Sequence, residues 1–124
     1  MENIKKILII DDEESIRQIY HKVFSDQGFS AETAVDGQEG LLKAAEWKPN
    51  VILLDIMLPK MSGLDVLKSL KNNNLTKSIP VLLLTNIGDE SVIKDGFKYG
   101  ADGYFLKVSY SPYQVVEECK KYIK

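Results

Sequence analysis

The sequence predicts a single α/β domain: a five-stranded parallel sheet, wound in the common order 2-1-3-4-5, with helices on both faces. Three observations support this. The apolar runs at residues 7–10, 51–54 and 81–84 are unbroken, as expected of strands buried on both faces. Segments with helical spacing alternate with the strands five times. The 124 residues, 44% hydrophobic, suffice for one core, so we expect residues 1–124 to form one domain.

The first half of the chain predicts two strand–helix units. Residues 4–10 form the first strand, and the helix after it ends at Gly28, a favourable C′ residue. Residues 29–35 alternate and predict a short strand. Asp36 opens the next helix in a capping-box pattern with Glu39, and Lys48-Pro49 ends it. The first of these helices carries its apolar residues at Ile16, Ile19, Tyr20, Val23 and Phe24.

The second half predicts three more units. The central strand at 51–54 is followed by Asp55, and Ser62 caps a helix that ends at the asparagines 72–74. The strand at 81–84 ends in Thr85, a helix spans 89–99, and the strand at 103–106 ends in Lys107. A last helix begins at Ser111-Pro112. We expect inward-facing residues on the last two helices at Val92, Ile93, Phe97, Val115, Val116, Cys119, Tyr122 and Ile123.

Composition narrows the class of protein. A net charge of −2 with mixed signs gives no indication of nucleic-acid or membrane binding. The single cysteine, Cys119, excludes a disulfide framework and suits a reducing cytosol; we expect it in the core. No apolar run approaches the roughly 18 residues of a membrane span, and the start lacks a signal peptide. We therefore expect a cytoplasmic domain.

The polar residues at the strand ends carry the chemistry. Parallel strands end at the same rim of the sheet, so Asp11 and Asp12, which follow strand 1, should face Asp55 where the strand order reverses. Three carboxylates this close would raise at least one pKa unless a cation intervenes. Thr85 and Lys107 reach the same rim. One lysine is too little charge to balance three acids.

Oxygen ligands in an incomplete set indicate Mg²⁺ that keeps waters and accepts a phosphate oxygen. Beside Mg²⁺ and Lys107, Asp55 can stay ionised and act as a nucleophile. A phosphoryl group would bring oxygens for the metal, for the ammonium and for the Thr85 hydroxyl. The rim therefore predicts phosphoryl transfer to Asp55.

With these residues, the chain closely resembles the receiver domain of two-component response regulators, which has the CheY-like, flavodoxin-like (βα)5 fold. The resemblance runs from Ile-Leu-Ile-Ile-Asp-Asp-Glu-Glu at 7–14 through Leu-Leu-Asp at 53–55, Pro59, Gly63 and Leu-Leu-Thr at 83–85 to Gly-Ala-Asp-Gly-Tyr-Phe-Leu-Lys at 100–107. It implies a signalling domain that catalyses only its own phosphorylation and dephosphorylation, and is not otherwise an enzyme.

The resemblance also implies roles for residues. Asp55 would be the phospho-acceptor, taking its phosphoryl group from a histidine kinase's phosphohistidine. Asp12, Asp55 and the Met57 carbonyl would bind Mg²⁺ directly, with Asp11 acting through water. Thr85 and Lys107 would each contact a phosphoryl oxygen. Tyr104 matches the switch aromatic, which turns inward as Thr85 moves. The readout surface would comprise the fourth helix, the fifth strand and the fifth helix.

Partners follow from the same resemblance. We expect a sensor histidine kinase or phosphotransfer protein upstream, and a protein target or a missing output domain downstream, since the chain is either a stand-alone regulator or part of a longer protein. Phosphorylation-dependent homodimerisation is a further expectation. Direct nucleic-acid binding and membrane binding are not expected.

Some positions depart from the family pattern. Val108 follows Lys107 in place of the usual cis proline, so we expect a trans peptide bond there. Asn86 stands where a small residue is common and could crowd the phosphoryl group. Met57 and Ile87 are apolar where other members carry polar groups. We hypothesise that these two side chains hinder the hydrolytic water and give a long-lived phosphoform.

Other interpretations remain open on the sequence. A degenerate receiver could act as a phosphorylation-independent protein-binding module. A flavodoxin-like flavin binder would need a Ser-, Thr- or Gly-rich loop after strand 1, where this chain has Asp-Asp-Glu-Glu. An aspartyl phosphohydrolase would place its nucleophile on strand 1 with a second acid two residues on, whereas Asp11 and Asp12 are adjacent.

Overall fold

The computed structural model describes residues 4–86 and 90–123. Its five strands pair in parallel in the order β2-β1-β3-β4-β5, which confirms the predicted topology. Each strand leads into a helix. The elements are β1 (Lys6–Ile10), α1 (Glu14–Asp26), β2 (Ser30–Ala34), α2 (Gly37–Trp47), β3 (Val51–Asp55), α3 (Gly63–Lys71), β4 (Val81–Thr85), α4 (Glu90–Lys98), β5 (Gly103–Leu106) and α5 (Pro112–Lys120).

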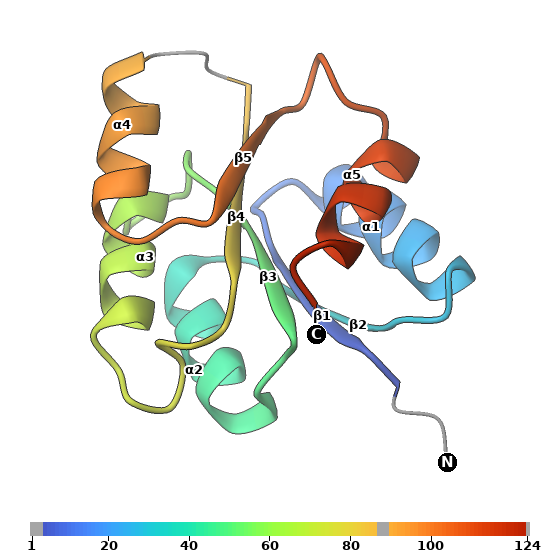
Figure 1. Ribbon diagram of the computed structural model, residues 1–124, viewed down its shortest axis with the longest axis horizontal. Helices are drawn as coiled ribbons and strands as arrows, with labels where there is room; N and C mark the ends of the chain where they lie inside the picture. The colour runs from blue at the N-terminus through green and yellow to red at the C-terminus, as the bar shows by residue number, and fades with distance from the viewer. Residues whose placement is uncertain (1–3, 87–89, 124) are drawn as a thin grey trace.

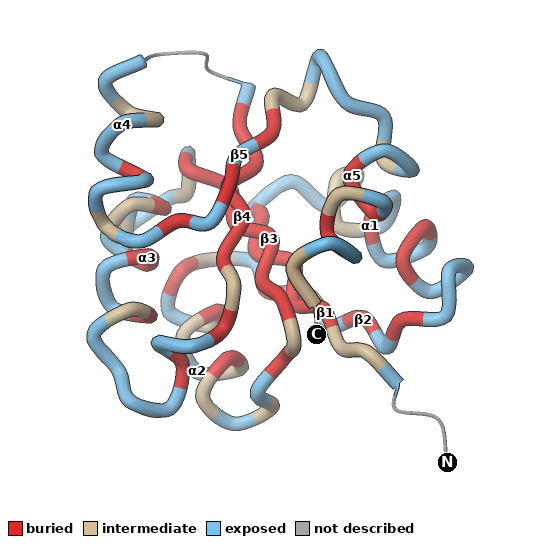
Figure 2. The backbone as a smooth tube through the Cα atoms, in the orientation of Figure 1, coloured by how far each residue is buried: buried red, intermediate tan, exposed pale blue. Residues whose placement is uncertain are grey.

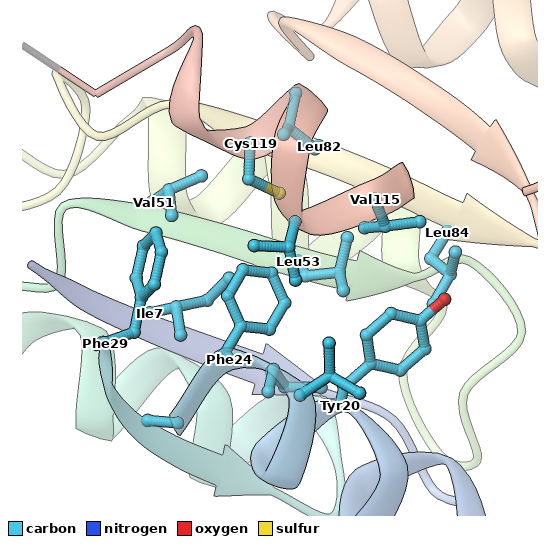
Figure 3. Packing of buried hydrophobic residues seen from close by; sticks show 14 of the residues in the cluster. Ile7, Tyr20, Phe24, Phe29, Val51, Leu53, Leu82, Leu84, Val115 and Cys119 are labelled. Carbon is cyan, nitrogen blue, oxygen red and sulfur yellow. The ribbon is translucent and has the colours of Figure 1, made fainter. Parts of the chain in front are cut away.

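The sheet separates two layers of helices. Helices α1 and α5 cover one face, and α2, α3 and α4 lie on the other (Figure 1). Successive strand residues point to opposite faces, so each strand contributes to both cores. In β3, for example, Leu53 faces the α1–α5 side while Leu54 faces the α2–α3 side. Figure 3 shows Tyr20 and Phe24 of α1 packed on the sheet face that carries Ile7 and Leu53, with Val115 and Cys119 of α5 in the same cluster.

The central strands are the most deeply buried part of the chain. Every residue of β3 and of β4 is buried, whereas the helices turn exposed faces outward (Figure 2). This explains why their sequences read as continuous apolar runs. Cys119 is buried in the core as predicted, and burial, with a smaller effect from Glu118, raises the pKa of its thiol to about 12. Within the described residues, no helix has both the length and the apolar character to cross a bilayer.

Side-chain caps fix the starts of three helices at the predicted residues. Asp36 accepts a hydrogen bond from the Glu39 amide, Ser62 from the Asp65 amide, and Ser111 from the Gln114 amide. In the capping box predicted at α2, the bond to the Asp36 side chain forms. The reciprocal bond does not reach the Asp36 amide, because Glu39 Oε1 accepts from the Val35 amide instead, at 3.1 Å. These caps matter for the site, since helices α2 and α3 begin just beyond the carboxyl ends of β2 and β3.

Some local predictions were wrong. Strand β1 begins at Lys6, and Ile4 is exposed. Phe97, expected to face inward on its helix, is 47% exposed, and Ile19, which shares the apolar spacing of α1, is 44% exposed. Helical spacing shows which residues share a face but not whether another element covers the whole face. In α4 the buried residue is Gly96, whose close approach to Leu83 leaves Phe97 at the margin of the interface. The predicted helix start at Asp89 lies outside the described residues.

Candidate functional site

The structure brings the predicted acids together at the carboxyl ends of β1 and β3. One carboxylate oxygen from each of Asp11, Asp12 and Asp55 lies within 4.8 Å of the other two. Asp11 and Asp55 are buried, with 1% and 4% of their surface exposed, whereas Asp12 is exposed. Thr85 is fully buried at the end of β4. The predicted switch point between β1 and β3 is therefore where the acids meet.

Lys107 supplies a cation to this cluster. Its ammonium lies 3.0 Å from Asp11 Oδ2, 3.4 Å from Asp55 Oδ2 and 3.8 Å from Glu13 Oε1. Strand β5 spans Gly103–Leu106 as predicted, and Lys107 begins the turn that follows it. Its amide donates to the Thr85 carbonyl at 2.8 Å, which joins the ends of β4 and β5. The bond to Val108 is trans, as predicted.

Asp55 is held at both its side chain and its backbone. Its Oδ1 accepts a hydrogen bond from the Met57 amide at 3.1 Å. Gly63 packs against it so closely that a Cβ on this glycine would lie 2.3 Å from the Asp55 carbonyl oxygen and 2.5 Å from the Ile56 Cα. The Gly63 amide donates to the Ile56 carbonyl at 2.8 Å. The loop after β3 is thus folded back onto the strand end that carries Asp55.

The electrostatics of Asp55 agree with the sequence prediction of mutual repulsion. Burial, and then the charge of Asp11, raise the pKa of the Asp55 carboxyl to about 6. Lys107 and the Met57 amide oppose this rise, because both stabilise the ionised form. Burial tends to lower the pKa of Lys107, but its hydrogen bond to Asp11 and the charge of Asp55 leave it raised overall. Lys107 is therefore cationic, and a single cation does not fully offset the acids.

The donor set fits a hard divalent cation. Oxygens on one octahedral Mg²⁺ lie about 3 to 4 Å apart, which carboxylates within 4.8 Å of one another reach with small movements or through a bridging water. Two of the three acids are buried, and they share only one lysine within the described residues. Carboxylate oxygens are the ligands that Mg²⁺ prefers, so this cluster has the chemistry of a magnesium site.

Sequence reasoning missed two residues at the site. No role was predicted for Glu13 from the sequence, yet its carboxylate oxygen Oε1 lies 3.8 Å from the Lys107 ammonium. Arg17 was not singled out, and its Nη1 donates to the Asp11 carbonyl oxygen at 2.8 Å. A signal for Arg17 existed: helical side chains lean toward the helix N-terminus, so a long side chain in the first turn of α1 can reach the loop before it.

The remaining predicted residues differ in exposure and in their contacts. Met57 is 59% exposed and Val108 83% exposed, and both lie next to residues of the site. Asn86 is exposed, and Ile87 lies outside the described residues. Tyr104, on β5, is 38% exposed and meets Phe97 of α4 edge to face, with ring centroids 5.9 Å apart. Tyr104 therefore points outward, against the α4 side of the sheet.

Comparisons with known proteins place this geometry in a family. The family model for the response regulator receiver domain matches residues 7–118. The chain is 40% identical over 120 residues to the alkaline phosphatase synthesis transcriptional regulatory protein PhoP of Bacillus subtilis, covering 97% of this chain and 49% of that protein. It is 36% identical over 120 residues to the phosphate regulon protein PhoB of Pseudomonas aeruginosa, covering 97% and 52%. The chain thus spans about half the length of these relatives.

Solved structures agree. Chemotaxis protein CheY4 of Vibrio cholerae superposes with a TM-score of 0.91 at 30% identity, over 98% of this chain and all of that one. A BeF3-activated DrrB receiver domain gives 0.85 at 28% identity, over 97% of both chains. The chain belongs to the response regulator receiver domains, the phosphorylation-accepting signalling domains of two-component systems.

Proposed function

We propose that Asp55 is the residue that accepts the phosphoryl group, and that the donor is a phosphohistidine of a sensor histidine kinase or phosphotransfer protein. A carboxylate oxygen of Asp55 forms the new bond to phosphorus as the phosphorus–nitrogen bond breaks, and the bonding electron pair stays on the imidazole. In this account the domain catalyses only its own phosphorylation and dephosphorylation. The observation that carries the proposal is that the buried Asp55 carboxylate, at the end of the central strand, lies 3.4 Å from the Lys107 ammonium and within 4.8 Å of carboxylate oxygens of Asp11 and Asp12.

Asp55 must be ionised to attack phosphorus. Lys107, 3.4 Å away, and the Met57 amide, 3.1 Å away, both favour the carboxylate over the acid. Burial works against them, so further positive charge at the site would favour the ionised form of Asp55. Phosphoryl transfer depends mainly on positioning and charge neutralisation, which a rigid and buried carboxylate beside cations provides.

Mg²⁺ is the cofactor in this proposal. Asp12, Asp55 and the Met57 carbonyl would hold it directly, and Asp11 would act through water. The bound ion would neutralise charge on Asp55 and on the transferring phosphoryl oxygens. Asp11 also holds Lys107 at 3.0 Å, which keeps the ammonium beside Asp55 before a phosphoryl group arrives.

Thr85 and Lys107 would then contact two phosphoryl oxygens and transmit the change. The backbone hydrogen bond between them, 2.8 Å long, couples a movement at one strand end to the other. Tyr104 lies two residues from the end of β5 and in this structure stacks outward on Phe97. We propose that phosphorylation draws Thr85 inward, that Tyr104 follows, and that the surface formed by α4, β5 and α5 changes for its reader.

Partners and context belong to the same proposal. The relatives named above are transcriptional regulators about twice the length of this chain, so the reader of the switch is an attached output domain or a separate protein target. The α4–β5–α5 surface is also the place for phosphorylation-dependent homodimerisation. We propose that residues 1–124 act as one receiver domain in the cytoplasm, without direct contact to nucleic acid or membrane.

Intact-mass spectrometry after incubation with acetyl phosphate tests this function. With Mg²⁺, we expect one phosphoryl adduct on the wild-type chain, and without Mg²⁺ far less. Asp55→Asn should show no adduct. Asp65→Asn is the matched control, since it makes the same substitution at an exposed acid of α3 outside the cluster and should label like wild type.

The alternative of a phosphorylation-independent binding module predicts a different result. It requires folded wild-type protein that takes no adduct with Mg²⁺ present. An adduct of equal yield in wild type and Asp55→Asn would contradict Asp55 as the acceptor without contradicting the receiver family.

A further inference from the structure

The turn between β1 and α1 carries two of the three acids and is tied to the protein at several atoms. The Asp11 amide donates to the Ala34 carbonyl at 3.1 Å, and Asp11 Oδ1 accepts from the Glu13 amide at 2.9 Å. The Asp11 carbonyl oxygen accepts from Arg17 Nη1 at 2.8 Å. Three of these contacts use backbone groups of the turn, so they set its conformation.

The bond from Arg17 acts on the peptide plane that joins the two aspartates. The Asp11 carbonyl and the Asp12 amide belong to one rigid planar unit. When the oxygen of this unit is held, the rotation of the unit is restricted, and with it the range of directions in which the Asp12 side chain can leave the backbone. Asp12 is exposed, so packing does little to orient it. Its aim toward the cluster therefore depends on the backbone.

Arg17 is suited to this task. It is the only arginine in the chain, it is half-buried in the first turns of α1, and its side chain leans back over the turn. A hydrogen bond from a charged guanidinium to a carbonyl is stronger than one between neutral groups. The charge of Arg17, taken alone, would weaken Mg²⁺ binding, because a cation close to three acids repels a second cation. Removal of Arg17 should therefore lower the affinity for Mg²⁺ if its role is to position Asp12, and raise that affinity if only its charge matters.

We propose that Arg17 is a positioning residue for the metal site: by holding the Asp11–Asp12 peptide plane, it keeps Asp12 aimed at the cation that Asp11, Asp12 and Asp55 share. This inference rests on the Mg²⁺ site of the proposed function. Partners of metal ligands contribute strongly to metal affinity, and their loss typically costs about 10- to 100-fold.

Titration with MgCl2, followed by two-dimensional amide NMR, tests the proposal, because it gives a Kd and shows that each variant is folded. Arg17→Met keeps an unbranched apolar stem but loses the charge and the donors, and should weaken Mg²⁺ binding about tenfold. Arg17→Lys keeps the charge and a hydrogen-bond donor group, and should weaken Mg²⁺ binding less. Lys22→Met removes a cation from an exposed position on the same helix and should match wild type.

A second readout separates positioning from general damage. In phosphorylation by acetyl phosphate, Arg17→Met should need about tenfold more Mg²⁺ for half-maximal rate but reach the wild-type rate at saturating Mg²⁺. Mg²⁺ binding by Arg17→Met as tight as, or tighter than, that of wild type would overturn the proposal and leave Arg17 with an electrostatic effect only. Failure of wild type itself to bind Mg²⁺ would instead contradict the proposed function.

Discussion

Lys107 Nζ lies 3.4 Å from Asp55 Oδ2, and this ion pair joins the end of the central strand to the turn after the edge strand β5. The same ammonium contacts Asp11 at 3.0 Å, so one cation serves two buried carboxylates. Because one positive charge does not balance two buried negative charges, the site should affect the stability of the domain in ways that can be measured without any partner protein.

The raised pKa of Asp55 predicts a stability that falls as pH rises. Folded Asp55 has a pKa of about 6 against 3.8 for the unburied group, so the folded state binds its proton more tightly. The resulting stabilisation is complete below about pH 4 and is lost as pH rises through 6, a loss of up to about 3 kcal/mol. Urea unfolding without divalent metal should show Asp55→Asn more stable than wild type at pH 7.

Two comparisons check the origin of that effect. Asp65→Asn should follow the wild-type pH profile, because its carboxyl is exposed. Added Mg²⁺ should raise the free energy of unfolding of wild type at pH 7, since it binds the folded state. An Asp55→Asn variant less stable than wild type at pH 7 would contradict the unbalanced charge inferred for the site.

Removal of Lys107 should have the opposite effect on stability. Lys107→Met leaves Asp11 and Asp55 buried without their shared cation, so we expect a loss of about 2 kcal/mol or more at pH 7. The loss should shrink toward pH 4, where Asp55 is protonated in both proteins. The rate of phosphorylation by acetyl phosphate should fall at least about tenfold. Lys121→Met, which removes an exposed lysine, should leave stability and rate unchanged; equal effects would point to net charge instead.

The contact between Gly63 and Asp55 predicts a steric requirement for glycine. In Gly63→Ala the new Cβ would meet backbone atoms, which cannot turn aside as a side chain can, so we expect about 2 kcal/mol of destabilisation and a displaced Asp55. Thermal unfolding and acetyl phosphate labelling measure these effects. Gly28→Ala is the matched control: it has open space around it but a φ of +91°, so it should lose stability yet label normally. Normal labelling by Gly63→Ala would refute the positional role.

Met57 tests the hypothesis of a long-lived phosphoform. Its side chain is 59% exposed beside Asp55, where it can exclude the hydrolytic water but offers it no hydrogen bond. Decay of the phosphorylated protein in Mg²⁺, followed by mass spectrometry, should be slow, and several-fold faster in Met57→Asn. Met61→Asn, in the same loop but away from Asp55 in the sequence, should decay like wild type. A wild-type half-life of seconds would reject the hypothesis.

Most of the fold could be predicted from the sequence because the central strands are continuous apolar runs and all five parallel strands end at one rim. The acids, Thr85 and Lys107 were predicted at that rim for the same reason, since strand ends follow directly from strand positions. The wrong predictions concern side chains whose exposure depends on whether a neighbouring helix or strand covers them. Phe97 continues the apolar spacing of α4, yet only the packing of Gly96 on Leu83 determines that its ring meets Tyr104 at the surface.

The contacts that long side chains make could not be predicted from the sequence pattern either. The shared salt bridges of Lys107 with Asp11 and Glu13 span 96 and 94 positions of the chain, and nothing in the local sequence specifies the direction of the ammonium. The bond from Arg17 to the Asp11 carbonyl is local, but a carbonyl acceptor leaves no signature in the sequence.

The acceptor residue can be identified directly by borohydride reduction of the phosphorylated protein, which converts an aspartyl phosphate to homoserine, followed by peptide mapping. The central claim is that Asp55, the carboxylate beside Lys107, carries the phosphoryl group. The account predicts homoserine at position 55 and unmodified aspartate at 11 and 12. Homoserine at either of those two positions, with aspartate intact at 55, would contradict it.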